Sequence, residues 1–272
     1  MDIDLLVHGL RNTSEVATAE LPTLLETDTS HVSQLELTTA IYAHAVTQSD
    51  AIAALLAAGF SEQANALVRT FYDLEDQLIY IGMLGGEAVR RYVTYDLFAR
   101  LRFSALVDAD LEPPGALEEV NHLAQTWEVN MEATTSHDAI RQLCEAIIGE
   151  REPSVWFACV PNRKRRRGEF RTKYISVKTT HLPGTDIGSE DDRDLVYGTI
   201  MSGQVHASPT AIVNRLRPGL RIGPTVELSA STALMTHTML ERISTAYAHL
   251  SDEPRHEDRW EDARRLIEDG AR

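Results

Sequence analysis

The sequence is poor in cysteine, in basic residues and in long apolar runs, and each shortage excludes a class of protein. Its two cysteines, Cys144 and Cys159, cannot form a disulfide framework or a four-thiolate zinc site. The 26 basic residues against 41 acidic ones give a net charge of −15, which argues against coating of a nucleic acid or an anionic membrane by the whole surface. No window approaches the roughly 18 uninterrupted apolar residues of a membrane-spanning helix.

The N-terminal region and the common catalytic motifs are equally uninformative about chemistry. The first 25 residues contain one base, Arg11, and no apolar core, so we expect no signal or transit peptide and a cytoplasmic protein. The sequence has no glycine-rich phosphate loop, GxSxG elbow, HExxH or CxxC motif. Glu119 and His122 form one Glu-x-x-His unit, but di-iron bundles need two, and the other copy contains Pro254. We therefore predict no metal site and no cofactor.

The composition is that of a globular protein, and the periodicity is mostly helical. The 272 residues are 43% apolar and 25% charged, enough to bury one large core or two modest ones. The apolar spacing and the capping residues predict helices over 34–58, 62–84, 87–108, 113–131, 136–150, 189–209, 225–250 and 257–269. Residues 1–32 are expected to form one short helix and loops, and Ser61 and Ser136 are expected to cap the helices that follow them.

Residues 151–188 interrupt the helical pattern. The run from Ser154 to Val160 is apolar, too short for a helix and rich in aromatic and β-branched residues, and Thr172 to Val177 also has strand character. We predict a β-hairpin or two loose strands here. The expected fold is an all-α helical bundle with a small β-hairpin-like insertion. It divides into an N-terminal segment 1–32, a single helical domain 33–250 with the insertion at 151–188, and a C-terminal helix 251–272.

The predicted helix 62–84 carries a charged pair opposite an apolar stripe. The stripe consists of Leu67, Phe71, Leu74, Leu78 and Ile81. Arg69 and Asp73 lie one turn apart on the other side, which also carries Tyr72, Ile79 and Tyr80. Because a helix with apolar residues on both sides is usually buried on both sides, the pair has three interpretations. It is a solvated i,i+4 pair, an internal ion pair or part of a functional site.

The predicted helix 189–209 places Gly198, Ser202 and His206 at four-residue steps. The small residues permit close packing by a neighbouring helix. His206 lies in the last turn before Pro209, where the helix carbonyls favour an imidazolium. Such a histidine either transfers a proton or binds an anion, or it closes the helix end as a packed, hydrogen-bonded residue.

Taken together, these two helices resemble a large family of uncharacterised, mostly helical bacterial proteins that is described as a domain of unknown function. The resemblance lies in the Arg-x3-acid segment of 62–80 and in a Tyr, a Ser and a Val-His near the end of the match. It implies that the polar positions of the family are Arg69, Asp73, Tyr197, Ser202 and His206. Asp73 stands where that family more often has Glu, and the charge is kept. The family itself supplies no activity.

Families of this kind are compared with the HEPN helical domains, many of which are RNA-cleaving toxins or defence proteins. Their Arg-x4–6-His signature is met here by Arg242 and His249, although Ile243 follows the arginine where a polar residue is usual. The first hypothesis is an HEPN-like RNA-processing or defence-type protein. In it His206 acts as general acid–base, Arg69 binds phosphate, and Asp73 and Ser202 orient them. The alternative is a non-catalytic helical interaction module in which the same residues are structural. The sequence leaves open whether the chain is an enzyme.

A dense basic run lies in the predicted insertion. Between 163 and 173 seven basic residues oppose only Glu169, which gives a local charge of +6. The seven are Arg163, Lys164, Arg165, Arg166, Arg167, Arg171 and Lys173. This run suits the phosphates of RNA or an acidic protein partner, or it is a solvated turn. It also fits an acidic face of a second copy, so a homo-oligomer is a further expectation, whereas no membrane contact is expected.

Overall fold

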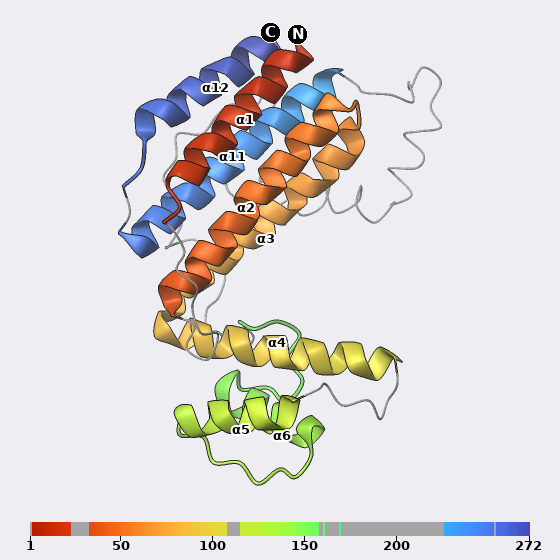
Figure 1. Ribbon diagram of the computed structural model, residues 1–272, viewed down its shortest axis with the longest axis vertical. Coiled ribbons are helices and arrows are strands. Elements are labelled where there is room, and N and C mark those ends of the chain that lie inside the picture. Colours follow the sequence, from red (N-terminus) through yellow and green to blue (C-terminus); the bar gives the residue numbers. More distant parts are fainter. Residues whose placement is uncertain are drawn as a thin grey trace. The chain divides into compact units, whose positions relative to one another are not determined.

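The computed structural model describes residues 2–22, 33–107, 115–157, 160, 169, 226–252 and 254–272. Over these ranges the chain forms helices and no strand (Figure 1). The helices predicted over 34–58, 62–84, 87–108, 225–250 and 257–269 are confirmed, each to within two residues at either end. None of the described helices is both long enough and apolar enough to cross a membrane.

The chain divides into two compact units. The first comprises Met1–Asp28, Leu35–Ile79 and Glu169–Arg272, and the second comprises Thr29–Gln34 and Tyr80–Gly168. The helices of the first unit are α1 (Ile3–Ala19), α2 (Gln34–Ala57), most of α3 (Ser61–Leu84), α11 (Val226–Ser251) and α12 (Glu257–Ala271). They lie side by side as a bundle, in which α1 packs against both α11 and α12 (Figure 1).

Helix α1 is longer than the short helix expected within residues 1–32. It runs for 17 residues, and the Asp2 side chain accepts hydrogen bonds from the first-turn amides of Asp4 and Leu5. Asp4 and Glu15 lie on its exposed face, while Leu6, Leu10, Thr13 and Ala17 form a buried stripe at helical spacing. The expectation of a short helix and loops was wrong because those acids break up the apolar run but leave its helical spacing of three and four residues intact.

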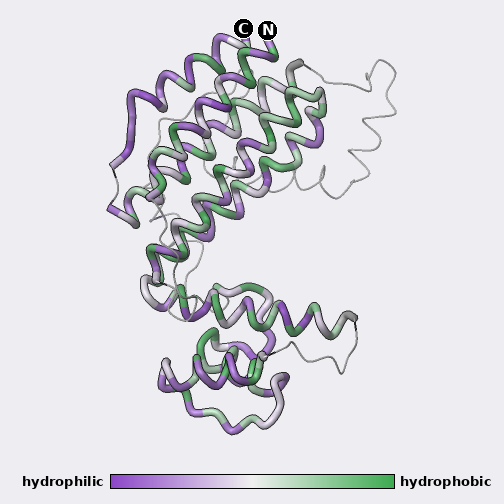
Figure 2. Tube along the Cα trace, viewed as in Figure 1, coloured by the Kyte–Doolittle hydropathy of each residue, from purple (hydrophilic) through white to green (hydrophobic). Residues whose placement is uncertain are grey.

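Helix α12 closes the first unit although most of its residues are hydrophilic (Figure 2). It buries Trp260, Ala263, Ile267 and Gly270, which recur at steps of three and four residues. It runs antiparallel to α1, so the two chain ends lie together (Figure 1). The amide of Asp2 donates to the carbonyl of Gly270 over 2.8 Å. The contact is tight at Gly9, where an added Cβ would lie 2.5 Å from Ile267 Cγ1.

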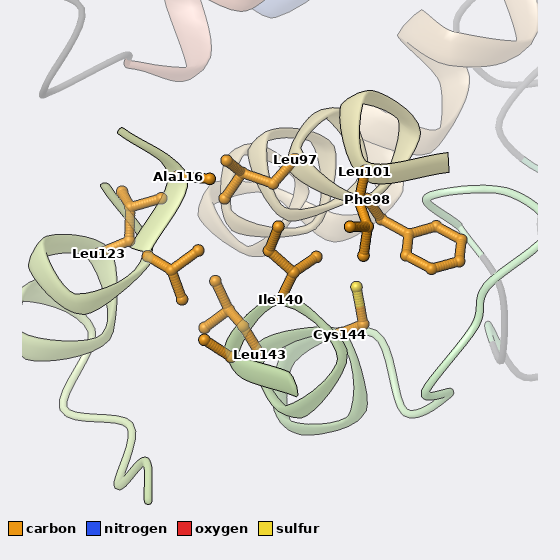
Figure 3. Close-up of a cluster of buried hydrophobic side chains, with 10 residues drawn as sticks. Leu97, Phe98, Leu101, Ala116, Leu123, Ile140, Leu143 and Cys144 are labelled. Atoms are coloured by element: carbon orange, nitrogen blue, oxygen red, sulfur yellow. The ribbon is translucent and has the colours of Figure 1, made fainter. Parts of the chain in front are cut away.

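The second unit is built on α4 (Gly86–Val107), α5 (Ala116–Thr126) and α6 (Ser136–Ile147). Their buried side chains point toward one another in a single apolar cluster (Figure 3). It consists of Leu97, Phe98, Leu101, Ala116, Val120, Leu123, Ala139, Ile140, Leu143 and Cys144. Burial raises the pKa of the Cys144 thiol to about 12, so this cysteine is a core residue and not a nucleophile.

Two helices of the second unit are shorter than predicted. Helix α5 ends at Thr126, well before residue 131, and Glu128 then takes a positive φ of 58°. Helix α6 ends at Ile147, and Gly149 follows with φ 90°. The residue that caps α6 is Thr135 and not Ser136, because the Thr135 hydroxyl accepts from the Asp138 amide over 3.3 Å.

The described part of the first predicted strand, residues 154–157 and 160, does not form a strand. Residues 154–157 form bends and turns, and the Tyr95 hydroxyl donates to the Ser154 carbonyl over 2.9 Å. Trp156 and Phe157 pack their rings on Tyr80, with centroid distances of 6.1 and 4.0 Å. The aromatic residues that suggested a pleated sheet thus pack their rings against other side chains of the unit, and Trp156 is buried there. The second predicted strand, Thr172 to Val177, lies outside the described residues.

Candidate functional site

The predicted pair Arg69–Asp73 is present on α3. Arg69 Nη2 lies 3.6 Å from Asp73 Oδ1, and the two side chains are 30% and 57% exposed. The helix is buried on both sides, as expected, because Phe71 and Leu78 on one side and Ile79 on the other have no exposure. The ion pair is therefore partly solvated and not internal.

The structure leaves the other residues of the predicted site undescribed. Tyr197, Ser202 and His206, the predicted helix 189–209 and the basic run of Arg163, Lys164, Arg165, Arg166, Arg167, Arg171 and Lys173 lie outside the described residues. Arg242 and His249, the HEPN-like pair, both lie on α11. The Arg242 side chain is buried against Glu75, whereas His249 is exposed. The two side chains of this pair therefore lie in different environments.

The structure instead reveals a buried polar network in the first unit, which we call the inner network. It links α1, α2, α11, α12 and the residues that lead into α12. Its members are Thr13, Glu20, Tyr42, His237, Glu241, Ser244, Arg255, Trp260 and Arg264. Buried ionised groups are costly unless they are paired and hydrogen-bonded, so each member requires a partner.

Glu20, directly after α1, is the most heavily bonded carboxylate of the inner network. It accepts from Ser244 Oγ at 2.6 Å, from Tyr42 Oη at 2.7 Å, from Trp260 Nε1 at 2.8 Å and from the His256 amide at 3.2 Å. One carboxylate thus ties α2, α11 and α12 to the end of α1. Burial, and then the nearby charge of Glu20, raise the pKa of Tyr42 well above its usual value, so the phenol stays a donor.

Glu241 is the second carboxylate of the inner network and faces two arginines. Arg264 Nη2 donates to its Oε2, and Arg255 Nη2 lies 3.9 Å from its Oε1. Burial raises the pKa of Glu241, while the charge of Arg264 opposes that shift. Arg255 also donates to Ser244 over 3.2 Å, which joins this carboxylate to the Glu20 cluster.

His237 completes the inner network and is 1% exposed. Its Nδ1 lies 3.0 Å from Thr13 Oγ1, whose own proton is donated to the Gly9 carbonyl, so we assign the imidazole proton to Nδ1. Its Nε2 lies 3.9 Å from Glu241 Oε2. Burial, and then the charges of Arg264 and Arg255, lower the pKa of His237 to about 3, so the ring is neutral at pH 7.

A separate polar ladder runs between α3 and α11. Arg242 Nε donates to Glu75 Oε1 over 2.8 Å, and the Thr232 hydroxyl donates to Asn65 Oδ1 over 3.2 Å. Near the start of both helices the Ser61 and Ser229 hydroxyls lie 2.7 Å apart. Ser61 therefore pairs across the bundle instead of capping α3 as predicted.

Two cavities are lined by residues of the described ranges, and neither is lined by a member of the inner network. One cavity of about 550 Å³ is lined by Arg11, Ser14, Glu15, Thr18, Ala19, Asp50 and Ala54. The other, of about 330 Å³, lies in the second unit. Neither includes Glu20, His237 or Glu241. Within the described ranges no group of three or more His, Cys, Asp or Glu side chains gathers to hold a metal ion.

Sequence reasoning considered only Arg242 among these buried charges. Glu75 and Glu241 are surrounded by buried apolar residues of their own helices, and that spacing was the available signal, whereas Glu20 follows the end of α1 and carried no such signal. Comparison of the chain with models of protein families, with curated proteins and with solved structures found no match. The resemblance to a bacterial family of unknown function and to HEPN domains stays a prediction.

Proposed function

We propose that the chain is a non-catalytic helical interaction module whose embedded polar residues hold its helices in one arrangement. The observation that carries this proposal is the closure of the inner network. Glu20, Glu241 and His237 meet donors or charges from neighbouring helices and are each less than a tenth exposed. A reacting group has to be reachable by its substrate, whereas these groups are buried and line neither of the two cavities described above.

The Arg69–Asp73 pair supports the same proposal. At i,i+4 spacing and with Asp73 more than half exposed, it has the geometry of an ordinary helix-surface ion pair. Neither residue lines a cavity described above. In this function Arg69 and His206 are structural, and the surfaces of the helices bind the partner.

A nuclease assay on the full chain tests the module. Wild type, Arg69→Ala and His206→Ala are incubated with a mixed-sequence single-stranded RNA, and the melting temperature of each is measured. The module predicts that none of the three cleaves RNA and that any effect of the substitutions is on melting alone. Cleavage by the wild type that both variants lose would overturn it.

The second candidate is an HEPN-like RNA-processing or defence-type protein. The observations that favour it are the +6 run at 163–173 and the partly exposed Arg69 guanidinium. In this function Arg69 binds a phosphate, His206 transfers the proton, and Asp73, Ser202 and Tyr197 orient the two. It requires RNA cleavage that falls at least tenfold in both Arg69→Ala and His206→Ala while their folds persist.

The partner of the module is proposed to be RNA, an acidic protein or a second copy that meets the basic run. Fluorescence anisotropy with a labelled single-stranded RNA at two salt concentrations tests the first, because phosphate contacts weaken steeply with salt. The triple variant Arg165→Gln, Arg166→Gln, Arg167→Gln should lose most of that binding. Sedimentation of the same two proteins tests self-association through the run, which the triple variant should reduce.

A further inference from the structure

The cavity of the second unit lies between α4, the first turns of α6 and the segment 152–154. Its volume is about 330 Å³, within the usual range of pockets for small ligands. It is lined by Phe98, Leu101, Arg102, Ala105, His137, Arg141, Glu152, Pro153 and Ser154. All of these residues belong to one compact unit, so the cavity does not depend on how the two units are placed.

The apolar part of the cavity is formed by core residues. Phe98 and Leu101 belong to the buried cluster between α4 and α6, and Pro153 is also buried (Figure 3). Phe98 and Leu101 are only 3% and 2% exposed, so the apolar surface that they offer to the cavity is small and is fixed by their packing. Such a surface suits the hydrocarbon or ring portion of a ligand.

The polar part of the cavity is predominantly basic. It contains Arg102, Arg141 and His137, against Glu152 as the one acid of the lining. The Arg102 guanidinium carbon lies 6.0 Å from the centroid of the Phe98 ring, so one charge stands directly beside the apolar surface. His137 and Arg141 are one helical turn apart on α6, which places them on the same side of that helix.

Two features make Arg141 and the start of α6 suited to an anion. Arg141 Nε donates to Glu152 Oε1 over 2.9 Å, which fixes the guanidinium while its two other nitrogens keep donor capacity. His137 is the second residue of α6, a helix of 12 residues whose positive dipole end lies here. In a chain of net charge −15, the lining of this cavity has two arginines against one glutamate.

We propose that this cavity binds a small amphipathic carboxylate, with its apolar body on Phe98, Leu101 and Pro153 and its carboxylate between Arg102 and Arg141. A planar carboxylate matches the fork of donors that a guanidinium presents. The apolar surface favours an aromatic or branched body over a purely polar anion. The site is separate from the inner network and from Arg69, so it does not rest on the proposed function.

The test uses 2-naphthoate as the probe and calorimetric titration of the full chain. We expect saturable binding at a ratio of one to one, and at least tenfold weaker binding of 2-naphthamide, which has the same body without the charge. Inorganic phosphate, which lacks the apolar body, should also bind at least tenfold more weakly. The absence of saturable naphthoate binding would overturn the proposal, as would equal binding of the amide.

Variants locate the binding to this cavity. Arg102→Gln and Arg141→Gln should each weaken naphthoate binding about tenfold, one charge-assisted contact being removed. Arg151→Gln is the matched control, because Arg151 pairs with Asp138 over 3.2 Å and does not line the cavity. It should bind like the wild type.

A variant that fills the cavity tests the site without disturbing the Arg141–Glu152 ion pair. Ala105 lines the cavity and is exposed, so Ala105→Phe should occupy the apolar space without altering charge or core packing. Loss of naphthoate binding with an unchanged melting temperature supports the assignment. Undiminished binding in Ala105→Phe and in both arginine variants would place the ligand elsewhere and overturn it.

Discussion

Arg242 on α11 and Glu75 on α3 form a buried ion pair in which Nε and Nη2 lie 2.8 and 2.7 Å from the same carboxylate oxygen. The two side chains are only 8% and 1% exposed. Removal of one partner strands the other charge in the bundle, so Arg242→Met or Glu75→Leu should each cost about 3–5 kcal/mol of unfolding free energy. Urea denaturation of the purified variants measures this.

The double variant separates pairing from burial. Arg242→Met with Glu75→Leu removes both charges and leaves apolar side chains, so it should recover most of the loss of either single variant. Asp73→Ala is the control, because the Arg69–Asp73 pair is partly solvated and worth about 0.5 kcal/mol. If either single variant costs no more than Asp73→Ala, Arg242–Glu75 is not the stabilising contact that its burial implies.

Glu20 is the residue of the inner network whose loss should be most costly. Glu20→Gln keeps the shape but turns one acceptor oxygen into a donor, which then faces either the Tyr42 and Ser244 hydroxyls at Oε2 or the Trp260 and His256 N–H donors at Oε1. Leaving such donors unsatisfied should cost about 3 kcal/mol or more, against about 1 kcal/mol for Tyr42→Phe. Glu15→Gln, an exposed acid on α1, should change the unfolding free energy by less than about 0.5 kcal/mol. Equal costs for Glu20→Gln and Glu15→Gln in chemical denaturation would contradict this role.

The helical framework was readable from the sequence because long apolar periods survive in α2, α3, α4, α11 and α12. The segment 154–157 was not, since a short aromatic run looks the same whether it pairs as a strand or packs rings on helices. In the structure Phe157 packs on a helix residue, since its ring stacks on that of Tyr80 with 4.0 Å between the ring centroids. That contact joins residues 77 positions apart, which local patterns do not report.

The polar residues of the inner network were even harder to predict from local sequence patterns. The Arg69–Asp73 pair was predictable because both residues lie on one helix at a spacing that brings them together. The partners of Glu20 were not, because Ser244 and Trp260 are 224 and 240 residues away along the chain. A single sequence shows Glu20 only as an acid at a helix end. The packing of α1 against α11 and α12 is what makes it a buried acceptor of four hydrogen bonds.

The contact between α1 and α12 depends on two glycines. A Cβ at Gly9 would lie 2.5 Å from Ile267 Cγ1, and one at Gly270 would lie 2.9 Å from the Leu6 amide nitrogen. Gly9→Ala and Gly270→Ala should therefore each lower the unfolding free energy by about 1–3 kcal/mol. Gly86→Ala is the matched control, because a Cβ there meets no atom within 4 Å. It should leave stability unchanged or raise it by about 0.5 kcal/mol. A Gly9→Ala variant as stable as Gly86→Ala would contradict this close approach.

His237 should make the stability of the first unit depend on pH. Its pKa is about 3 in the folded chain against 6.5 for an ordinary histidine, so the unfolded chain binds the proton more tightly. The stability that comes from keeping His237 neutral is fully present above pH 6.5 and is lost as the pH falls toward 3. A shift of this size corresponds to a stability contribution on the order of 5 kcal/mol.

Two variants isolate that contribution. His237→Asn keeps an N–H donor for Thr13 but does not titrate, so its unfolding free energy should fall less steeply than that of the wild type between pH 6.5 and 3. The groups that face His237 are Glu241, Arg255, Arg264, Thr13 and Trp260. The raised pKa of Glu241 acts in the opposite sense, since it disfavours folding as the pH rises, but it is present in both proteins. The difference between the two curves of unfolding free energy against pH is therefore due to His237.

His249→Asn, at an exposed position of the same helix, is the control and should follow the wild-type curve. If the unfolding free energies of wild type and His237→Asn fell in parallel with decreasing pH, His237 would not be responsible for the loss of stability in acid.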